Sequence, residues 1–406
     1  MEQIITSLLD NDLYKFNMGQ VLLHQFADAH VVWEYKNRDS ETRKFTPEMV
    51  DEIKRQVQLF CSLKFYKDEL IYLAKECPWL TKDYLDFLSI YQPSYDWYDI
   101  SLKDDNQLSV IITGAQFLTT YCETPTMAII SEVWFRYSLS DEEYEEAIAE
   151  LYRRTDEKIV KLISGDYKLG GFSDFGTRRR FSKQTFEEII KKFSSSAKDF
   201  AGSVFVGTSN VEYAKKYGVK PVGTMAHELI QTIGQGYPER NPAYSNKFVM
   251  DAWHAEYGTE NGTYLTDCIG TEVFLRDFTK VEAKLFDGVR HDSGNPYEWG
   301  EKMITHYESL GIDTRSKTLL FSDSLDFDRA HALREAFMNR TKVAFGIGTF
   351  IVADTTQKAM NQVLKVVEVN GRPVAKLSDV EGKNMCRDEQ YIEYLKRTIK
   401  WRMEHN

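Results

Sequence analysis

The sequence is poor in the residues that mark secreted or membrane-spanning proteins. Its 406 residues include 5 cysteines, which are scattered and form no C-x-x-C pair. This scarcity excludes a disulfide framework and a cysteine zinc site, and it favours a reduced, cytoplasmic protein. No run approaches the roughly 20 apolar residues of a membrane span. Residues 1–10 lack the basic start and long apolar core of a secretory signal, so we expect none.

Positively charged residues are fewer than negatively charged ones. Lysine and arginine number 51 against 62 aspartate and glutamate residues, which gives a net charge of −11. Such a chain repels nucleic acid and anionic membranes, and we expect neither as a partner. The 42% of hydrophobic residues is typical of a globular protein. An anionic ligand would therefore have to bind to a local group of cations.

Short apolar runs that end in polar or glycine-rich tips recur between residues 164 and 354, each followed by helical sequence. The runs predict strands at residues 203–206, 219–222, 263–265, 285–289, 318–321 and 342–345. Alternating strands and helices indicate parallel β-α units, as in an α/β barrel or a doubly wound sheet. In both architectures ligands bind at the carboxyl ends of the strands, where these tips would lie.

The flanking segments have other patterns. Residues 108–113 resemble a strand, and Ser140 with Glu143 forms the capping box of a long helix. Its apolar stripe consists of Ala147, Ile148, Leu151, Tyr152, Ile159 and Ile163. Near the C-terminus, residues 366–369 and 374–377 flank Asn370-Gly371 and predict a β-hairpin, and residues 388–403 predict an amphipathic helix. We expect a mixed α+β domain (1–137), an α/β barrel catalytic domain (138–365), and a hairpin and helix returning to the first domain (366–406).

Three consecutive arginines, residues 178–180, follow a glycine-containing segment at residues 170–176. Guanidinium groups bind phosphate or carboxylate with two parallel hydrogen bonds, so this segment is a candidate anion clamp. A solvated helix start is the alternative, and the sequence does not indicate which arginine would contact a ligand.

His227 follows the strand tip at Gly223-Thr224 and directly precedes helical sequence. A histidine in this place can be a general base, a metal ligand or a nucleophile, or simply a structural residue. The H-E-x-x-H zinc motif is absent, because Gln231 occupies the second histidine position.

The segment from Arg290 to Gly294 combines a cation, the carboxylate of Asp292 and a glycine. Asp292 could bind sugar hydroxyls or stabilise positive charge on a ribose ring, or it could cap the helix that begins near Pro296. Asp323 and Asp326 present the same choice between a magnesium or hydroxyl site and helix capping.

A glycine-rich tip, residues 346–349, could present backbone N–H groups to a phosphate. Arginines, a histidine, carboxylates and a phosphate loop on one barrel face would suit a phosphorylated sugar.

Six ordered motifs resemble those of the nicotinate phosphoribosyltransferase family over essentially the whole chain. They lie at residues 12–15, 123–132, 174–182, 223–228, 290–294 and 345–349. The resemblance implies an irregular, TIM-like α/β barrel of the type II phosphoribosyltransferase class. It also implies a mixed α+β N-terminal domain, completed by C-terminal segments, and homodimers with shared sites.

The family reaction converts nicotinate and phosphoribosyl pyrophosphate to nicotinate mononucleotide and pyrophosphate, with Mg²⁺ present, and it is coupled to ATP hydrolysis through a phosphohistidine. By motif position, His227 would be that phosphohistidine. The pyridine nitrogen displaces pyrophosphate at the anomeric carbon, so the transition state has oxocarbenium character and an anionic leaving group. Magnesium and arginines would neutralise that leaving group.

The resemblance also implies roles for other residues. Phe175 would stack on the pyridine ring, opposite Tyr14 of the neighbouring subunit, and Asp292 would hold the ribose hydroxyls. Ser209 replaces an aspartate that is typical of nicotinamide-using relatives, which favours the acid substrate. Gly348 and Thr349 would form the loop that binds the 5′-phosphate, and Arg178 and Arg290 would contact the carboxylate or phosphates of the substrates. The remaining expected substrate-binding residues are Thr208 and Asp323.

Several alternatives remain open at this point. A nicotinamide phosphoribosyltransferase shares the chemistry, and a quinolinate enzyme would have to bind two carboxylates. A phosphosugar aldolase or isomerase on a TIM barrel would need a lysine or carboxylate base at a strand end. A non-enzymatic phosphoprotein scaffold would have no use for a complete anion site.

Overall fold

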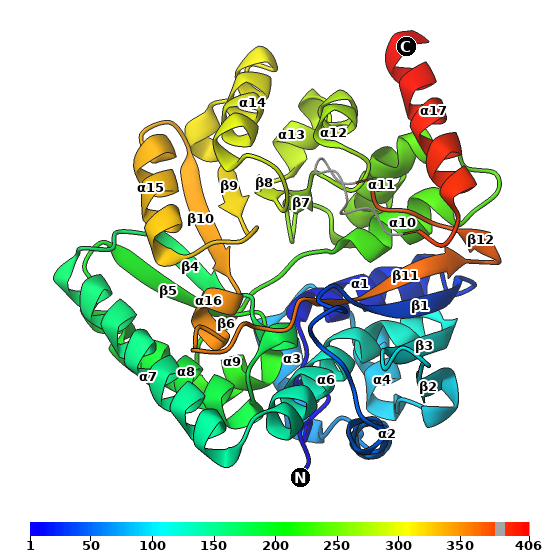
Figure 1. The fold of residues 1–406 in the computed structure, drawn as a ribbon. Helices are drawn as coiled ribbons and strands as arrows, with labels where there is room; N and C mark the ends of the chain where they lie inside the picture. Colours follow the sequence, from blue (N-terminus) through cyan, green and yellow to red (C-terminus); the bar gives the residue numbers. More distant parts are fainter. Residues whose placement is uncertain (378–385, 406) are drawn as a thin grey trace.

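The computed structural model describes residues 1–377 and 386–405 and contains two β-sheets covered by helices (Figure 1). One sheet has five antiparallel strands and the other has seven parallel strands. The parallel sheet curls like part of a barrel, which confirms the predicted fold class. Every helix among the described residues is too short or too polar to cross a lipid bilayer.

The antiparallel sheet combines both ends of the chain. Its order is β12-β11-β1-β3-β2. The strands are β1 (His30–Asn37), β2 (Tyr98–Leu102), β3 (Leu108–Ala115), β11 (Gln362–Val369) and β12 (Arg372–Pro373). β11 pairs with β1 from Val31↔Val369 to Asn37↔Gln362. A segment from the C-terminal part of the chain thus supplies an inner strand beside β1.

The predicted hairpin is present, with a shorter second strand than expected. Asn370 and Gly371 have φ values of 50° and 73°, the positive values that a tight hairpin turn requires. The strand that follows covers residues 372–373 instead of 374–377. The expected domain boundaries stay a prediction, and residues 378–385 and 406 of the last segment lie outside the described residues.

Helices of the N-terminal part bring polar residues to the junction between the two sheets. They are α1 (Leu13–Gln25), α2 (Pro47–Cys61), α3 (Lys67–Glu76), α4 (Lys82–Ile90), α5 (Gln116–Thr119) and α6 (Glu123–Ser138). α1 and α6 are mostly buried, and each begins beside the parallel sheet. Their first turns carry Tyr14, Lys15 and Glu123, which therefore lie near the strand tips.

The long helix α7 (Asp141–Ser164) begins at the predicted capping box. Ser140 Oγ accepts from the Glu143 N–H at 3.2 Å, and Glu143 accepts from the Ser140 N–H at 2.8 Å. Most of the predicted apolar stripe faces the core. Ile163 does not, with 43% of its surface exposed, whereas its neighbour Leu162 is fully buried.

The parallel sheet has the order β6-β5-β4-β10-β9-β8-β7. Its strands are β4 (Gly170–Asp174), β5 (Ser203–Thr208), β6 (Lys220–Pro221), β7 (Thr263–Leu265), β8 (Gly288–His291), β9 (Thr318–Phe321) and β10 (Lys342–Ile347). The predicted strands at 263–265 and 318–321 have the observed bounds. The strand predicted at 285–289 begins later, because α13 (Lys280–Leu285), capped by Thr279, includes its first residue.

Sequence reasoning missed β4. Residues 170–174 contain two glycines and a single large apolar residue, so they lack a strand pattern. The strand is nevertheless central, since β5 and β10 pair with it on both sides. Phe172 anchors it within a buried aromatic cluster with Phe193, Phe205 and Phe327.

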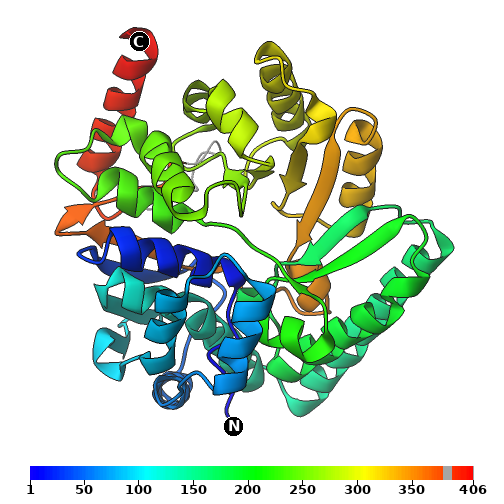
Figure 2. The same ribbon diagram turned by 180° about the vertical axis from the view of Figure 1, so that it is seen from behind.

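Helices line the outside of the curled sheet (Figures 1 and 2). The helices of this part of the chain are α8 (Lys183–Ser196), α9 (Val211–Tyr217), α10 (His227–Gln235), α11 (Ser245–Tyr257), α12 (Thr271–Asp277), α14 (Pro296–Ser309), α15 (Phe327–Phe337) and the four-residue α16 (Thr349–Val352). Of these, α10 packs against β11 of the antiparallel sheet, and α11 packs against α1. The predicted C-terminal helix is α17 (Glu389–His405), whose buried Arg402 pairs with Asp277. α17 also packs against the short turn Pro242–Tyr244.

Candidate active site

A histidine at the start of a helix meets two aspartates that follow the neighbouring strands β7 and β8. His227 begins α10, Asp267 follows β7 and Asp292 follows β8. His227 Nε2 lies 2.8 Å from Asp267 Oδ1 and 3.7 Å from Asp292 Oδ2. The structure therefore brings together His227 and Asp292, the two residues predicted to be catalytic.

The His227 ring is buried and neutral. Burial, together with the nearby Lys376 ammonium, lowers the pKa of His227 to about 4, although the two carboxylates act in the opposite direction. A neutral imidazole has one N–H, and the carboxylate of Asp267 can only accept. Nε2 therefore carries the proton and donates to Asp267, which leaves the lone pair on Nδ1. This is the protonation state that a nucleophilic histidine needs.

Asp267 and Lys376 are functional candidates that sequence reasoning missed. Asp267 Oδ2 accepts from Ser293 Oγ at 2.5 Å and pairs with Lys376 Nζ at 2.9 Å. Burial raises the pKa of Asp267, but His227 and Lys376 outweigh burial and hold it well below its ordinary value. The Thr266-Asp267 strand tip was a usable signal for the aspartate. Lys376, which follows the distant hairpin, gave none.

Asp292 lies at the edge of this group and is partly exposed. Its Oδ1 accepts from Ser322 Oγ at 3.0 Å and lies 3.8 Å from a guanidinium nitrogen of Arg290. Burial raises the pKa of Asp292, but the charge of the Arg290 guanidinium opposes burial, and the pKa is lowered below its ordinary value, so the carboxylate is ionised. The capping alternative for Asp292 is wrong, because Asn295 accepts from the N–H groups of Tyr297 and Glu298 and caps α14.

The sequence predicts either helix capping or ligand binding for Asp326 and for Asp323, and the structure shows capping for Asp326. Asp326 caps α15 by accepting from the Arg329 N–H at 2.7 Å. Asp323 follows β9 and accepts from Ser324 Oγ at 3.0 Å. It therefore remains a candidate for binding substrate at a strand tip.

The three arginines have different surroundings. Arg180 is fully buried and makes two hydrogen bonds to Asp10, at 2.7 and 2.8 Å, so it is structural. The Arg178 side chain is 33% exposed and lies 4.0 Å from Glu123. Burial lowers the pKa of Arg179 to about 10, helped by the charge of Arg178. Arg178 and Arg179 are thus the two that can contact an anion.

Phe175 packs closely against the end of β10 and the loop that follows this strand. A Cβ atom on Gly346 would lie 2.3 Å from the Phe175 ring, and one on Gly348 would lie 3.1 Å from the Phe175 carbonyl oxygen. Only glycine therefore fits at residue 346. The loop presents Gly348 as the N-cap of α16 and Thr349 as its first residue, beside the predicted ring-stacking residue.

A charged cluster joins the N-terminal helices to the parallel sheet. Lys15 Nζ lies 2.5 Å from carboxylate oxygens of both Glu123 and Glu228. The Tyr14 hydroxyl donates to Glu123 at 3.5 Å. Lys365 on β11 lies 3.8 Å from Glu123, and burial lowers the pKa of its ammonium to about 8. Lys365 is a second cation that sequence reasoning missed.

Ser209 and Thr208 lie in a buried hydrogen-bond chain. Ser209 Oγ donates to Asp12 Oδ1 at 2.7 Å, and Thr208 Oγ1 donates to Asp174 Oδ2 at 2.6 Å. Burial raises the pKa of Asp12, and it raises that of Asp174 to about 7. Ser209 donates a hydrogen bond to Asp12 and remains a neutral hydroxyl, so it offers no negative charge to a ligand.

The histidine and its two aspartates have the spacing of a metal site, since their ligand atoms lie within 4.8 Å of one another. Magnesium prefers an octahedral set of oxygen ligands. This set contains an imidazole, and the charge of Asp267 is already balanced by Lys376. The three residues therefore do not fit a dedicated magnesium site.

Comparisons with known proteins show which family the chain is similar to. The family model described as the nicotinate phosphoribosyltransferase (NAPRTase) family matches residues 171–402, and the model of its N-terminal domain matches residues 9–131. The nicotinate phosphoribosyltransferase of Ralstonia nicotianae is 40% identical over 398 residues, covering 98% of this chain and 99% of that protein. The one from Ectopseudomonas mendocina is 41% identical over 402 residues, covering 98% of both.

Solved structures show the same likeness. A crystal structure of nicotinate phosphoribosyltransferase from Vibrio cholerae has a TM-score of 0.90 and 32% identity, covering 98% of this chain and 95% of that chain. The structure from Porphyromonas gingivalis has a TM-score of 0.87 and 31% identity, covering 98% of this chain and 100% of that chain.

Proposed function

Since the chain belongs to the nicotinate phosphoribosyltransferase family, we propose that it transfers the phosphoribosyl group of phosphoribosyl pyrophosphate to nicotinate, and that ATP hydrolysis drives the transfer through His227. The products are nicotinate mononucleotide and pyrophosphate, a step of NAD biosynthesis. The observation that carries the ATP-coupled part is the neutral His227 ring, held by Asp267 with its Nδ1 lone pair available.

In the coupling step, His227 Nδ1 attacks the γ-phosphorus of ATP. An N–P bond forms, the bond to the bridging oxygen breaks, and ADP leaves. The ring then carries positive charge, which the carboxylate of Asp267 stabilises across the 2.8 Å hydrogen bond. Water later attacks the phosphohistidine and releases phosphate, so the histidine is regenerated in each cycle.

In the transfer step, the pyridine nitrogen attacks the anomeric carbon as the bond to pyrophosphate breaks. Positive charge develops on the ribose ring, and the ionised Asp292 supplies a nearby negative charge to stabilise it. Arg178, Arg179, Arg290 and Lys365 supply cations for the phosphates and the carboxylate of the substrates. Magnesium would arrive bound to the polyphosphates, where it neutralises charge on the leaving group.

The acid substrate is favoured by the chemistry around Ser209. An aspartate here would accept from the amide of nicotinamide and repel a carboxylate, whereas Ser209 carries no charge. The named relatives are nicotinate enzymes. We therefore prefer nicotinate to nicotinamide, and family membership leaves no support for an aldolase, an isomerase or a scaffold.

A homodimer with shared sites is part of the proposal. In such a dimer, Tyr14 of one copy would stack on the ligand opposite Phe175 of the other. Mixing two inactive variants, Tyr14→Ala and Phe175→Ala, should then restore part of the activity, because mixed dimers would contain one intact site. Failure to restore any activity in mixtures that exchange subunits would contradict shared sites.

The direct test is product formation from phosphoribosyl pyrophosphate and magnesium with nicotinate, nicotinamide or quinolinate, each with and without ATP. We expect nicotinate mononucleotide, formed faster with ATP. His227→Ala should abolish the ATP stimulation and leave slow transfer. Stimulation that persists in this variant would remove His227 from the coupling step, and preference for nicotinamide would overturn the argument from Ser209.

A further inference from the structure

The short helix α16 requires support from outside its own four residues. A helix of this length is not stable by itself, because the cost of nucleation exceeds the gain from its few hydrogen bonds. Its first residue, Thr349, belongs to the proposed phosphate loop, and Gly348 is its N-cap. Whatever fixes the far end of α16 therefore also fixes the loop.

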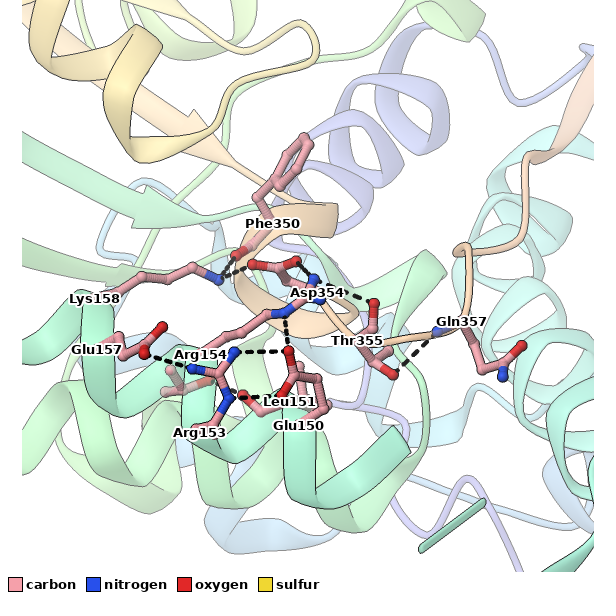
Figure 3. A network of polar contacts seen from close by, with 11 residues as sticks. Glu150, Leu151, Arg153, Arg154, Glu157, Lys158, Phe350, Asp354, Thr355 and Gln357 are labelled. Carbon is pink, nitrogen blue, oxygen red and sulfur yellow. Dashed lines mark hydrogen bonds and ion pairs between the residues drawn. The ribbon is translucent and has the colours of Figure 1, made fainter. Parts of the chain in front are cut away.

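That support comes from α7, which is distant in sequence (Figure 3). Lys158 Nζ donates to the carbonyl oxygen of Phe350 at 2.6 Å and pairs with Asp354 Oδ2 at 2.5 Å. Arg154 holds the other oxygen of Asp354 at 2.6 Å and donates to the Thr355 carbonyl oxygen at 3.2 Å. Two cations of α7 thus bind the helix and the residues directly after it.

The contact between Lys158 and Asp354 is largely sheltered from water. The side chains of Lys158 and Asp354 are only 13% and 17% exposed. The carbonyl groups at the C-terminal end of a helix lack partners within it, and Lys158 supplies one to Phe350. The lysine ammonium also lies 5.8 Å from the Phe327 ring at the start of α15. Its position is therefore fixed from two sides, unlike that of a solvated surface lysine.

We propose that Lys158 is a positioning residue for the 5′-phosphate of the ribose substrate, acting through Phe350 and Asp354 on the loop formed by Gly348 and Thr349. This inference rests on the proposed function, because it takes the loop as the phosphate site. The lysine does not contact the ligand. It sets the orientation of α16, so its loss should weaken the binding of a phosphorylated ligand more than that of the same ligand without phosphate.

The test compares Lys158→Met with Lys158→Arg and with a matched control, Lys161→Met. Lys161 lies on the same helix, is exposed, and contacts Tyr167 instead of α16. Binding of nicotinate mononucleotide and of its dephosphorylated nucleoside would be measured by calorimetry, with the KM of phosphoribosyl pyrophosphate and of nicotinate. Asp354→Asn serves as a second variant that keeps the side-chain shape.

We expect Lys158→Met to weaken mononucleotide binding by roughly 10- to 100-fold, since misplacement by about 1 Å costs up to that much. The KM of phosphoribosyl pyrophosphate should rise in parallel, while nucleoside binding and the KM of nicotinate stay unchanged. Lys158→Arg should recover most of the loss and Lys161→Met should show none. Equal weakening of both ligands, or a change in melting temperature alone, would overturn the proposal.

Thr349→Ala separates this inference from the function on which it rests. If Thr349→Ala selectively weakens mononucleotide binding and Lys158→Met does not, the positioning role is wrong and the phosphate loop stands. If neither variant changes the preference for the phosphorylated ligand, the loop assignment is wrong and the inference falls with it. If the unaltered protein does not bind the mononucleotide, the proposed function itself is wrong.

Discussion

The Nε2 atom of His227 lies 2.8 Å from Oδ1 of Asp267, and both side chains are almost completely buried. The second oxygen of Asp267 is occupied by Ser293 and Lys376. These contacts fix which oxygen faces the ring and therefore which ring nitrogen carries the proton. The tautomer of His227 is thus set by residues that follow β7, β8 and β12.

Asp267→Asn should reverse that tautomer. An asparagine has a single oxygen, and Ser293 and Lys376 both donate on the side away from the ring. The amide nitrogen would then face His227 Nε2 as a donor, which moves the ring proton to Nδ1 and removes the nucleophilic lone pair. We expect ADP formation to fall roughly 10²- to 10⁴-fold, as when the aspartate of a catalytic triad is replaced by asparagine.

The ATP-independent transfer rate serves as the control and should change little in this variant. ADP formation at the rate of the unaltered protein would contradict the orienting role of Asp267.

Asp292→Ala and Asn295→Ala form a matched pair that separates chemistry from helix capping. Asn295 caps α14, so its replacement should cost about 1 kcal/mol of stability and leave turnover intact. Asp292 faces His227 and makes no cap, so its replacement should lower kcat severely with little change in melting temperature. Activity assays and thermal unfolding of the two variants check both halves, and the reverse pattern would restore the capping interpretation of Asp292.

Local signals in the sequence predicted much of this molecule. The capping box of Ser140 and Glu143, the strand at residues 263–265 and the Asn370-Gly371 turn each depend on neighbouring residues. The rule that parallel strands place their tips together then located His227 and Asp292 on one face. These features could be predicted because each requires few long-range contacts.

Other features depend on contacts between distant segments. β4 has no strand pattern of its own and is held by β5 and β10. Lys376 pairs with Asp267 although the two are far apart in the sequence. Arg180 differs from Arg178 through its complete burial and its contact with Asp10. Three identical side chains in a row cannot be assigned to structure or to binding until the fold defines their surroundings.

Arg180→Met and Arg178→Met should therefore have opposite effects. Removing Arg180 leaves the buried Asp10 carboxylate without its ion-pair partner, which should cost about 3–5 kcal/mol of folding stability. Arg178 is partly exposed, so its loss should mainly raise the KM of the anionic substrates. Urea unfolding and steady-state kinetics measure the two effects. A double variant, Asp10→Asn with Arg180→Met, should recover part of the stability, and no recovery would contradict the ion-pair explanation.

The pKa of His227 provides the final prediction. Burial and the nearby Lys376 lower this pKa from its ordinary 6.5 to about 4. His227 therefore binds its proton at a lower pH in the folded protein than in the unfolded chain. The contribution of the neutral ring to stability is thus complete above pH 6.5 and is lost as the pH drops toward 4. The stability difference between the unaltered protein and His227→Gln should shrink over this interval.

Nitrogen NMR of ¹⁵N-labelled histidine measures the titration of His227 directly. Lys376→Met should raise its pKa, because the variant removes a repelling cation and leaves the negative charge of Asp267 less compensated. A pKa that stays the same in Lys376→Met would show that burial alone keeps the ring neutral. In that case Lys376 would stabilise Asp267 without tuning the histidine.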